Sequence, residues 1–149
     1  MKLAQLNIAS ARYPLDAPEI HEFTDNLERI NGLAEQSPGF VWRLKDESGD
    51  ATHIRLFDDP DLLVNMSVWD NLPSLTDFMY RTAHRDFMRK RREWFHSLSE
   101  HTHVLWWIAD NHRPTLEEAA ERLQYLRDHQ ATPFAFTLKN SFTAADITG

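Results

Sequence analysis

The sequence has no cysteine among its 149 residues, which excludes disulfides, thiolate metal sites and a cysteine nucleophile. It has only four glycines, Gly32, Gly39, Gly49 and Gly149. They are too scattered to form a phosphate-binding loop, so we expect no nucleotide cofactor. The G-x-S-x-G elbow of serine hydrolases is also absent from the sequence. Nucleophilic catalysis therefore finds little support.

Long apolar runs are absent too, since no stretch approaches the roughly 18 residues that span a bilayer. The first ten residues, MKLAQLNIAS, are too short and too polar for a signal peptide. A surplus of positive charge is also missing, because the formal net charge is −7. We therefore expect a cytoplasmic protein with neither a membrane nor a nucleic acid as its partner.

What is present is an ordinary globular composition, with 42% apolar and 26% charged residues. The length predicts one domain over 1–149. Alternating apolar and polar residues predict strands at 3–9, 40–46, 62–69 and 103–109, with 51–57 as a candidate hairpin partner. Helical spacing predicts helices over about 19–36, about 74–98 and 115–129, the last with Thr115 and Glu118 as a capping box. A short strand is predicted at 134–138.

The first six elements follow the order β-α-β-β-α-β, which predicts an α+β, ferredoxin-like fold with an added C-terminal helix and short strand. The predicted sheet has two different faces. One, the aliphatic face, carries Ala4, Leu6, Ile8, Val64, Met66 and Val68 and is expected under helices. The other, the mixed face, carries Gln5, Asn7, Asn65, Ser67 and Trp69. According to the register, the outer strands add Trp42 or Arg43 and Trp106 or Trp107 to it.

Aromatic and amide side chains together are unusual on a fully solvated sheet face and are typical of an interface or a binding groove. We expect the mixed face to meet a second copy of the chain in a homodimer. The alternative is that the C-terminal helix and strand cover this face within one subunit.

Long blocks at 3–9, 30–52, 58–95, 104–129 and 132–139 resemble the uncharacterised domain-of-unknown-function family 3291. Among these blocks are LAQLNIA, VLWWIADNHRPTLEEAAERLQYLRDH and TPFAFTLK. The family looks like a branch of the dimeric α/β-barrel superfamily, which includes antibiotic-biosynthesis monooxygenases that often work without metal or flavin, and haem-handling and stress-responsive members. The resemblance implies a ferredoxin-like dimer and transfers no catalytic residue. It implies no cofactor, and haem is left open with no ligand singled out.

Asn65, Ser67 and Trp69 share one strand face and can meet Asn7 from a neighbouring strand. Cofactor-free oxygenases that resemble this fold use such side chains to bind a phenol or quinol and favour its deprotonation. In that interpretation Asn65 orients a hydroxyl and Trp69 stacks on the ring. The alternative is a buried Asn–Asn or Asn–backbone hydrogen bond.

The stretch YRTAHRDFMRKRREWF (80–95) separates into two stripes at helical spacing. An apolar stripe holds Tyr80 and His84, and His84 is a candidate general base near neutral pH. A cationic stripe holds Arg81, Arg85, Arg89 and Arg92, and Arg85 is a candidate contact for an anionic ligand. The alternatives are a partly buried histidine with a satisfied hydrogen bond and a solvated, salt-bridged helix face.

Eight histidines raise the question of a metal site, with His96, His101, His103 and His112 nearest one another in sequence. No H-x-x-x-H or H-E-x-x-H pattern occurs, so we expect no metal.

We predict a pocket between the sheet and the second helix for a small, largely apolar, aromatic ligand. The predicted catalytic residues are His84, Asn65 and Tyr80, and the predicted ligand-binding residues are Trp69, Asn7, Ser67, Arg85 and Trp107. The expected activity is that of a cofactor-independent monooxygenase acting on a phenol or quinol. The alternative is a non-catalytic ligand-binding or stress-related protein.

Overall fold

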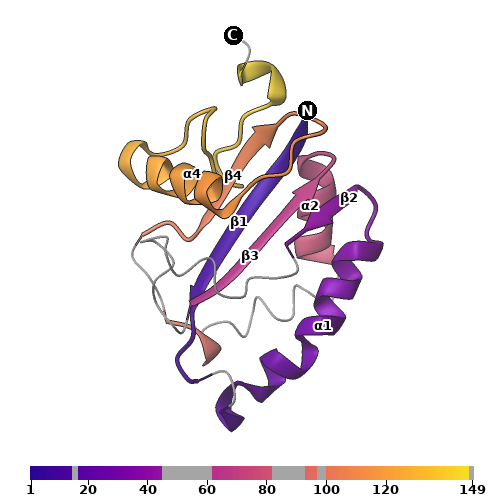
Figure 1. Cartoon of the computed structure of the whole chain (residues 1–149), viewed down its shortest axis with the longest axis vertical. Helices are drawn as coiled ribbons and strands as arrows, with labels where there is room; N and C mark the ends of the chain where they lie inside the picture. The colour runs from indigo at the N-terminus through magenta and orange to yellow at the C-terminus, as the bar shows by residue number, and fades with distance from the viewer. Residues whose placement is uncertain (15–16, 45–61, 82–92, 97–99, 148–149) are drawn as a thin grey trace.

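The computed structural model describes residues 1–14, 17–44, 62–81, 93–96 and 100–147 (Figure 1). Four strands form one antiparallel sheet in the order β2-β3-β1-β4. They are β1 (Lys2–Ser10), β2 (Phe40–Arg43), β3 (Leu62–Trp69) and β4 (His103–Ile108). The predicted α+β, ferredoxin-like arrangement is confirmed.

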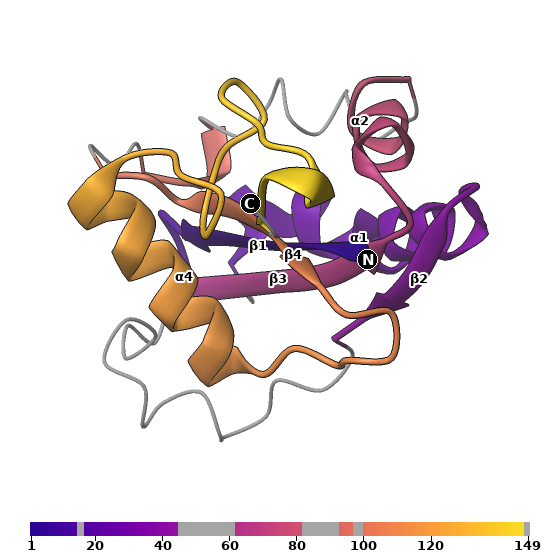
Figure 2. The same ribbon diagram turned by 90° about the horizontal axis from the view of Figure 1, so that it is seen from above.

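Helices lie on both sides of this sheet. They are α1 (His21–Gln36), preceded by the 3-10 turn η1 (Pro18–Ile20), α2 (Leu72–Arg81), α4 (Leu116–His129) and the terminal 3-10 turn η4 (Ala144–Ile147). Figure 2 shows α4 on one side of the sheet and α2 on the other. None of the described helices combines the length and the apolar character needed to cross a membrane.

The aliphatic face of the sheet lies under a helix, as expected, whereas the mixed face is covered by α1 and α2 of the same chain and not by a second copy. The aliphatic face packs on α4, whose Ala119, Ala120, Leu123 and Leu126 join it in one buried cluster. The mixed face lies under α1 and α2, where a second buried cluster contains Leu3, Ile30, Ala34, Trp69, Leu75, Phe78, Leu105 and Phe136. The C-terminal segment adds Phe136 and Phe142 at the β4 side of that cluster.

A sheet-to-sheet interface through the mixed face is therefore wrong, because α1 and α2 occupy that side. The physical reason is that the mixed face has enough apolar surface of its own, in Leu3, Trp69 and Leu105, to hold two amphipathic helices. Association of two copies by another surface remains a prediction, which light scattering on the purified chain would check.

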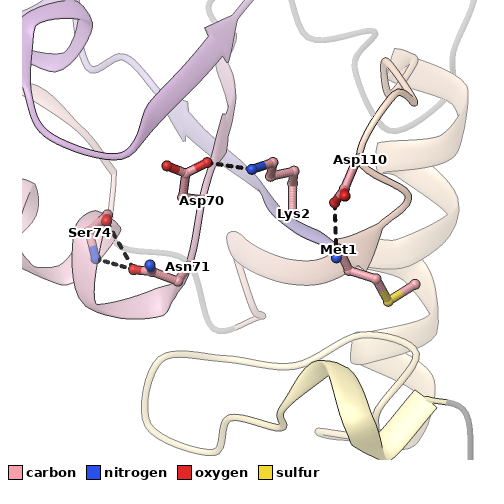
Figure 3. Close-up of polar contacts among 6 residues, drawn as sticks. All are labelled: Met1, Lys2, Asp70, Asn71, Ser74 and Asp110. Atoms are coloured by element: carbon pink, nitrogen blue, oxygen red, sulfur yellow. Dashed lines mark hydrogen bonds and ion pairs between the residues drawn. The ribbon is translucent and has the colours of Figure 1, made fainter.

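Several predicted boundaries are confirmed and others move. The Thr115 side chain accepts a hydrogen bond from the Glu118 amide at 3.1 Å, as the capping box predicts. The α2 helix begins two residues earlier than expected, because Asn71 Oδ1 accepts from both the amide and the hydroxyl of Ser74 at 2.9 Å (Figure 3).

Two predicted elements are shorter than expected. The helix predicted to reach residue 98 has ended by Phe95, which forms an antiparallel bridge with Ala11. The strand predicted at 134–138 is reduced to a single bridge between Phe136 and Leu105, because residues 132–135 turn back on themselves. The hairpin candidate at 51–57 lies outside the described residues.

A surface ion pair ties the start of β1 to the end of β3, where Lys2 Nζ lies 2.6 Å from Asp70 Oδ1 (Figure 3). The hydrogen bond to Asp70 is the largest of the causes that raise the pKa of Lys2 above its ordinary 10.5. Coulombic attraction to Asp70 and Asp110 adds to it, while desolvation opposes it. Any stability that the pair contributes is therefore present below the ordinary lysine pKa and is lost as pH rises through the raised one.

We expect Asp70→Asn to lower the pKa of Lys2 back toward 10.5, because the charged acceptor is lost. An NMR titration of the Lys2 side chain measures this directly. Asp146→Asn, a change in the exposed C-terminal turn, should leave the pKa of Lys2 unchanged. An equal pKa in the wild type and in Asp70→Asn would contradict the assigned cause.

Candidate ligand-binding site

A cavity of about 310 Å³ lies between the mixed face and the helices α1 and α2. Its floor is polar and includes Gln5, Asn7, Arg43, Asn65, Ser67 and His103. Its walls are largely apolar and include Phe23, Ile30, Ala34, Trp69, Leu75, Phe78 and Met79. The cavity therefore has a polar side and an apolar side, as small-molecule sites commonly do.

Strand register brings the polar side chains together. Gln5 pairs with Ser67, and Ser67 pairs with Arg43 on the next strand. Asn7 lies between Asn65 on one side and His103 on the other. Because alternate residues point to the same face of a strand, these side chains form two adjoining rows on the cavity floor.

Gln5 is the centre of a hydrogen-bond network on that floor and is only 5% exposed. Its Nε2 donates to Asn65 Oδ1 and to Ser67 Oγ, both at 2.8 Å. Its Oε1 lies 2.9 Å from His103 Nε2. Ser67 Oγ also accepts from the indole Nε1 of Trp69 at 2.9 Å. One buried amide thus connects side chains from three strands.

Trp69 is fixed on the aromatic side of the cavity. Its ring stacks on Phe78 with centroids 5.3 Å apart, and it meets Phe40 edge-to-face at 5.4 Å. Such pairs stabilise by about 0.5–1.5 kcal/mol beyond the area they bury. The ring is therefore a rigid wall of the cavity, whose position is set by Ser67 at one end and Phe78 on its face.

Four of the predicted site residues, Asn7, Asn65, Ser67 and Trp69, come together in the cavity lining. Tyr80 is 47% exposed and does not belong to that lining. Trp107 does not belong to it either, because its indole N–H donates to the Phe142 carbonyl at 2.8 Å at the outer edge of β4. The predicted residues His84 and Arg85 lie outside the described part of the chain.

Gln5 and His103 were not predicted as ligand-binding residues, and Arg43 was expected on the mixed face only as an alternative to Trp42. The pairing of Arg43 with Ser67 selects Arg43. Gln5 was visible as a polar residue on the mixed face, but its central place depends on β1 lying between β3 and β4. His103 was considered only as a metal ligand together with His101. The register of β1 with β4 places His103 beside Asn7. This register depends on the tertiary structure and cannot be predicted from local sequence patterns.

Three of the described histidines each contact a different side chain. His101 Nε2 lies 3.3 Å from Gln130 Oε1, His103 contacts Gln5, and His112 pairs with Glu118 at 2.6 Å. Among the described residues, no group of three or more histidine or carboxylate side chains converges on one point.

Comparison with solved structures gives distant similarities. A conserved protein from Methanosarcina mazei Go1 matches with a TM-score of 0.51 and 14% identity over 71% of this chain and 91% of that one. SnoaB, a cofactor-independent oxygenase from Streptomyces nogalater, matches with a TM-score of 0.47 and 18% identity over 78% of this chain and 98% of that one. At these identities the likeness concerns the fold alone.

Among curated proteins the chain finds no significant match. A family model, in contrast, covers almost the whole sequence. Residues 2–148 match the domain of unknown function DUF3291, and the chain belongs to this family.

Proposed function

We propose that this chain binds a small aromatic molecule of phenol or quinol type in the cavity and oxidises it with molecular oxygen, without a metal or flavin. The observation that carries the proposal is the cavity itself, which sets a row of polar side chains against apolar walls. Its volume of about 310 Å³ is near the lower end of the range of roughly 300–1,000 Å³ for ligand sites. A compact molecule of one to a few rings suits that space.

The two sides of the cavity favour one orientation of such a molecule. Apolar rings gain free energy by leaving water and packing between Ile30, Leu75 and Met79. The hydroxyl gains more by lying against the polar floor than against these side chains, because an unpaired polar group in an apolar site is costly. The hydroxyl is therefore expected beside Asn65 and Ser67.

The proposed reaction needs no outside reductant. The floor favours the deprotonated substrate, and this electron-rich anion transfers electrons to oxygen. One oxygen atom enters the ring to give a quinone, and the other leaves as water with two hydrogens from the substrate. Among the described cavity side chains, His103 has an imidazole ring that can accept or donate a proton. His84, the base predicted from sequence, remains a prediction.

A non-catalytic ligand-binding role is the second candidate. The observation that favours it is the buried network itself, in which Gln5 and Trp69 bond to neighbouring protein side chains. Binding of the probe 2-naphthol without oxygen uptake from a panel of quinols and anthrones would support this role over the oxygenase.

We expect Asn65→Leu to weaken binding of 2-naphthol about tenfold, because one hydrogen bond of about 1–1.5 kcal/mol is lost. If the chain is an oxygenase, oxygen uptake should also fall about 100-fold, as for loss of one donor to an oxyanion. Isothermal titration calorimetry and an oxygen electrode provide the two readouts. Asn140→Leu, at an exposed position outside the cavity lining, is the matched control. If Asn65→Leu and Asn140→Leu bound 2-naphthol with equal affinity, the polar floor would not take part in ligand binding.

A further inference from the structure

The hydrogen bonds on the cavity floor have a direction, and we infer that they make the floor a donor site for an anionic oxygen. The ligand class that follows is an aromatic molecule with a carboxylate or phenolate group, as opposed to an amine. The inference rests on the proposed binding function and adds the charge and hydrogen-bonding character of the ligand's polar end.

The donor-to-acceptor direction of the network can be followed from Trp69, because an indole N–H can only donate a hydrogen bond. Ser67 Oγ must therefore accept from Trp69 Nε1. The same oxygen also accepts from Gln5 Nε2. A hydroxyl oxygen has two lone pairs and one proton. With both lone pairs engaged, Ser67 has a donor left to offer.

Gln5 also donates a hydrogen bond to Asn65. The second Nε2 proton of Gln5 is donated to Asn65 Oδ1, so the carbonyl of Asn65 is engaged within the floor. The remaining polar group of Asn65 is its Nδ2, which has two protons to donate. Asn65 is exposed and lines the cavity, so a ligand can reach it.

The other end of Gln5 completes the pattern. Its Oε1 can only accept, so His103 must carry a proton on Nε2 in this arrangement. The acceptor oxygens Gln5 Oε1, Asn65 Oδ1 and Ser67 Oγ each take part in a hydrogen bond within the protein, whereas the amide of Asn7, also on the floor, can offer either a donor or an acceptor. What the floor has left to offer is mainly donors.

The charges of the cavity lining agree with this direction. Arg43 and His103 can carry positive charge, and none of the described lining residues is aspartate or glutamate. The whole chain, in contrast, has 23 acidic residues and a net charge of −7. Arg43 Nε pairs with Glu35 at 2.7 Å, which reduces its charge at the floor without placing a carboxylate in the lining.

The reverse arrangement predicts a different ligand. If the Gln5 amide were turned around, its oxygen would accept from Ser67 and Asn65, and Asn65 Oδ1 would become available as an acceptor. Such a floor would suit an ammonium or hydroxyl donor. The preferred charge of the ligand therefore reports the direction of the whole network.

Three probes with the same ring test the inference on the full chain, namely 2-naphthoate, 2-naphthylmethanol and 2-naphthylmethylammonium. By calorimetry we expect 2-naphthoate to bind about tenfold tighter than the alcohol, and the ammonium to bind weakest, since hydrogen bonds to a charged acceptor are the stronger ones. Equal affinities, or a preference for the ammonium, would overturn the donor site while leaving cavity binding intact. If none of the three binds, the proposed function falls with it.

Asn65→Asp gives a second test, because it keeps the shape of the side chain and replaces its donor with a negative acceptor. We expect 2-naphthoate affinity to fall about 30-fold, because like charges then face each other, and the ammonium to bind at least as well as before. Asn140→Asp adds the same charge outside the lining and should change affinity less than about twofold, given solvent screening. Should Asn65→Asp fail to fold, Asn65→Leu should lower the naphthoate-to-ammonium affinity ratio. An unchanged ratio in the folded variant would contradict the inference.

Discussion

Leu123→Ala is expected to lower the free energy of unfolding by about 3 kcal/mol, because it removes a large side chain from the centre of the α4 contact. Leu123 is 0% exposed and belongs to the cluster formed by α4 and the aliphatic face. Truncation leaves a cavity that Ala119 and Ala120 are too small to fill. Urea unfolding followed by circular dichroism measures the loss.

The matched control lies on the same helix. Glu121 is on the exposed side of α4, and Glu121→Ala should change the free energy of unfolding by less than about 0.5 kcal/mol. If Leu123→Ala cost no more than Glu121→Ala, α4 would not be packed on the aliphatic face. The measurement therefore tests whether α4 covers the aliphatic face of the sheet.

Gly39→Ala is expected to cost about 3 kcal/mol, from a backbone penalty of about 1–2 kcal/mol and the remainder from steric overlap. Gly39 has a φ of 85°, in the left-handed region that L side chains rarely adopt. A Cβ at this position would overlap the Ser74 side chain, which Asn71 holds in place. The Gly39 carbonyl also accepts from the Asp70 amide at 2.7 Å, so the turn cannot move freely.

Gly32→Ala is the control for this change, since it makes the same substitution seven residues earlier. Gly32 lies within α1, and a Cβ there would meet nothing within 4 Å. Alanine should stabilise the helix by about 0.5–1 kcal/mol. Thermal unfolding of both variants should therefore show opposite shifts in Tm. Shifts of the same sign would contradict the backbone argument at Gly39.

Secondary-structure elements that depend on neighbouring residues were predicted correctly from local sequence patterns. The bounds of β3 are those that alternation predicts over 62–69, and Thr115 caps α4 as its spacing with Glu118 indicates. The α2 helix begins earlier than predicted because Asn71, immediately before Leu72, caps it. The sequence DNLPS was expected to cap a helix from about Ser74, and Asn71 was not singled out as the cap.

The choice of sheet face could not be made from the sequence in the same way. Both faces of β1 are buried over Leu3 to Leu6, so alternation does not distinguish a face under α1 and α2 from a face under α4. The handedness of the crossovers decides which side α1 and α2 take. Which alternate residues point to that side depends on the register between strands, and that is a property of the folded sheet.

The candidate site was predicted in part for the same reason. Asn65, Ser67 and Trp69 alternate on one strand, so their common face followed from β3 alone. Gln5 and His103 join them only through pairing of β1 with β3 and β4. A hydrogen-bond network that spans three strands therefore cannot be predicted from the sequence of any one strand.

We propose that a small aromatic molecule binds between the mixed face and α2 with its polar end on the floor. Intermolecular NOEs to bound 2-naphthoate test it most directly. We expect NOEs from the ring protons to the methyl groups of Leu75 and Met79, and a downfield shift of the Asn65 side-chain amide protons on binding. NOEs confined to residues outside the cavity lining, with the Asn65 amide protons unshifted, would contradict this binding mode.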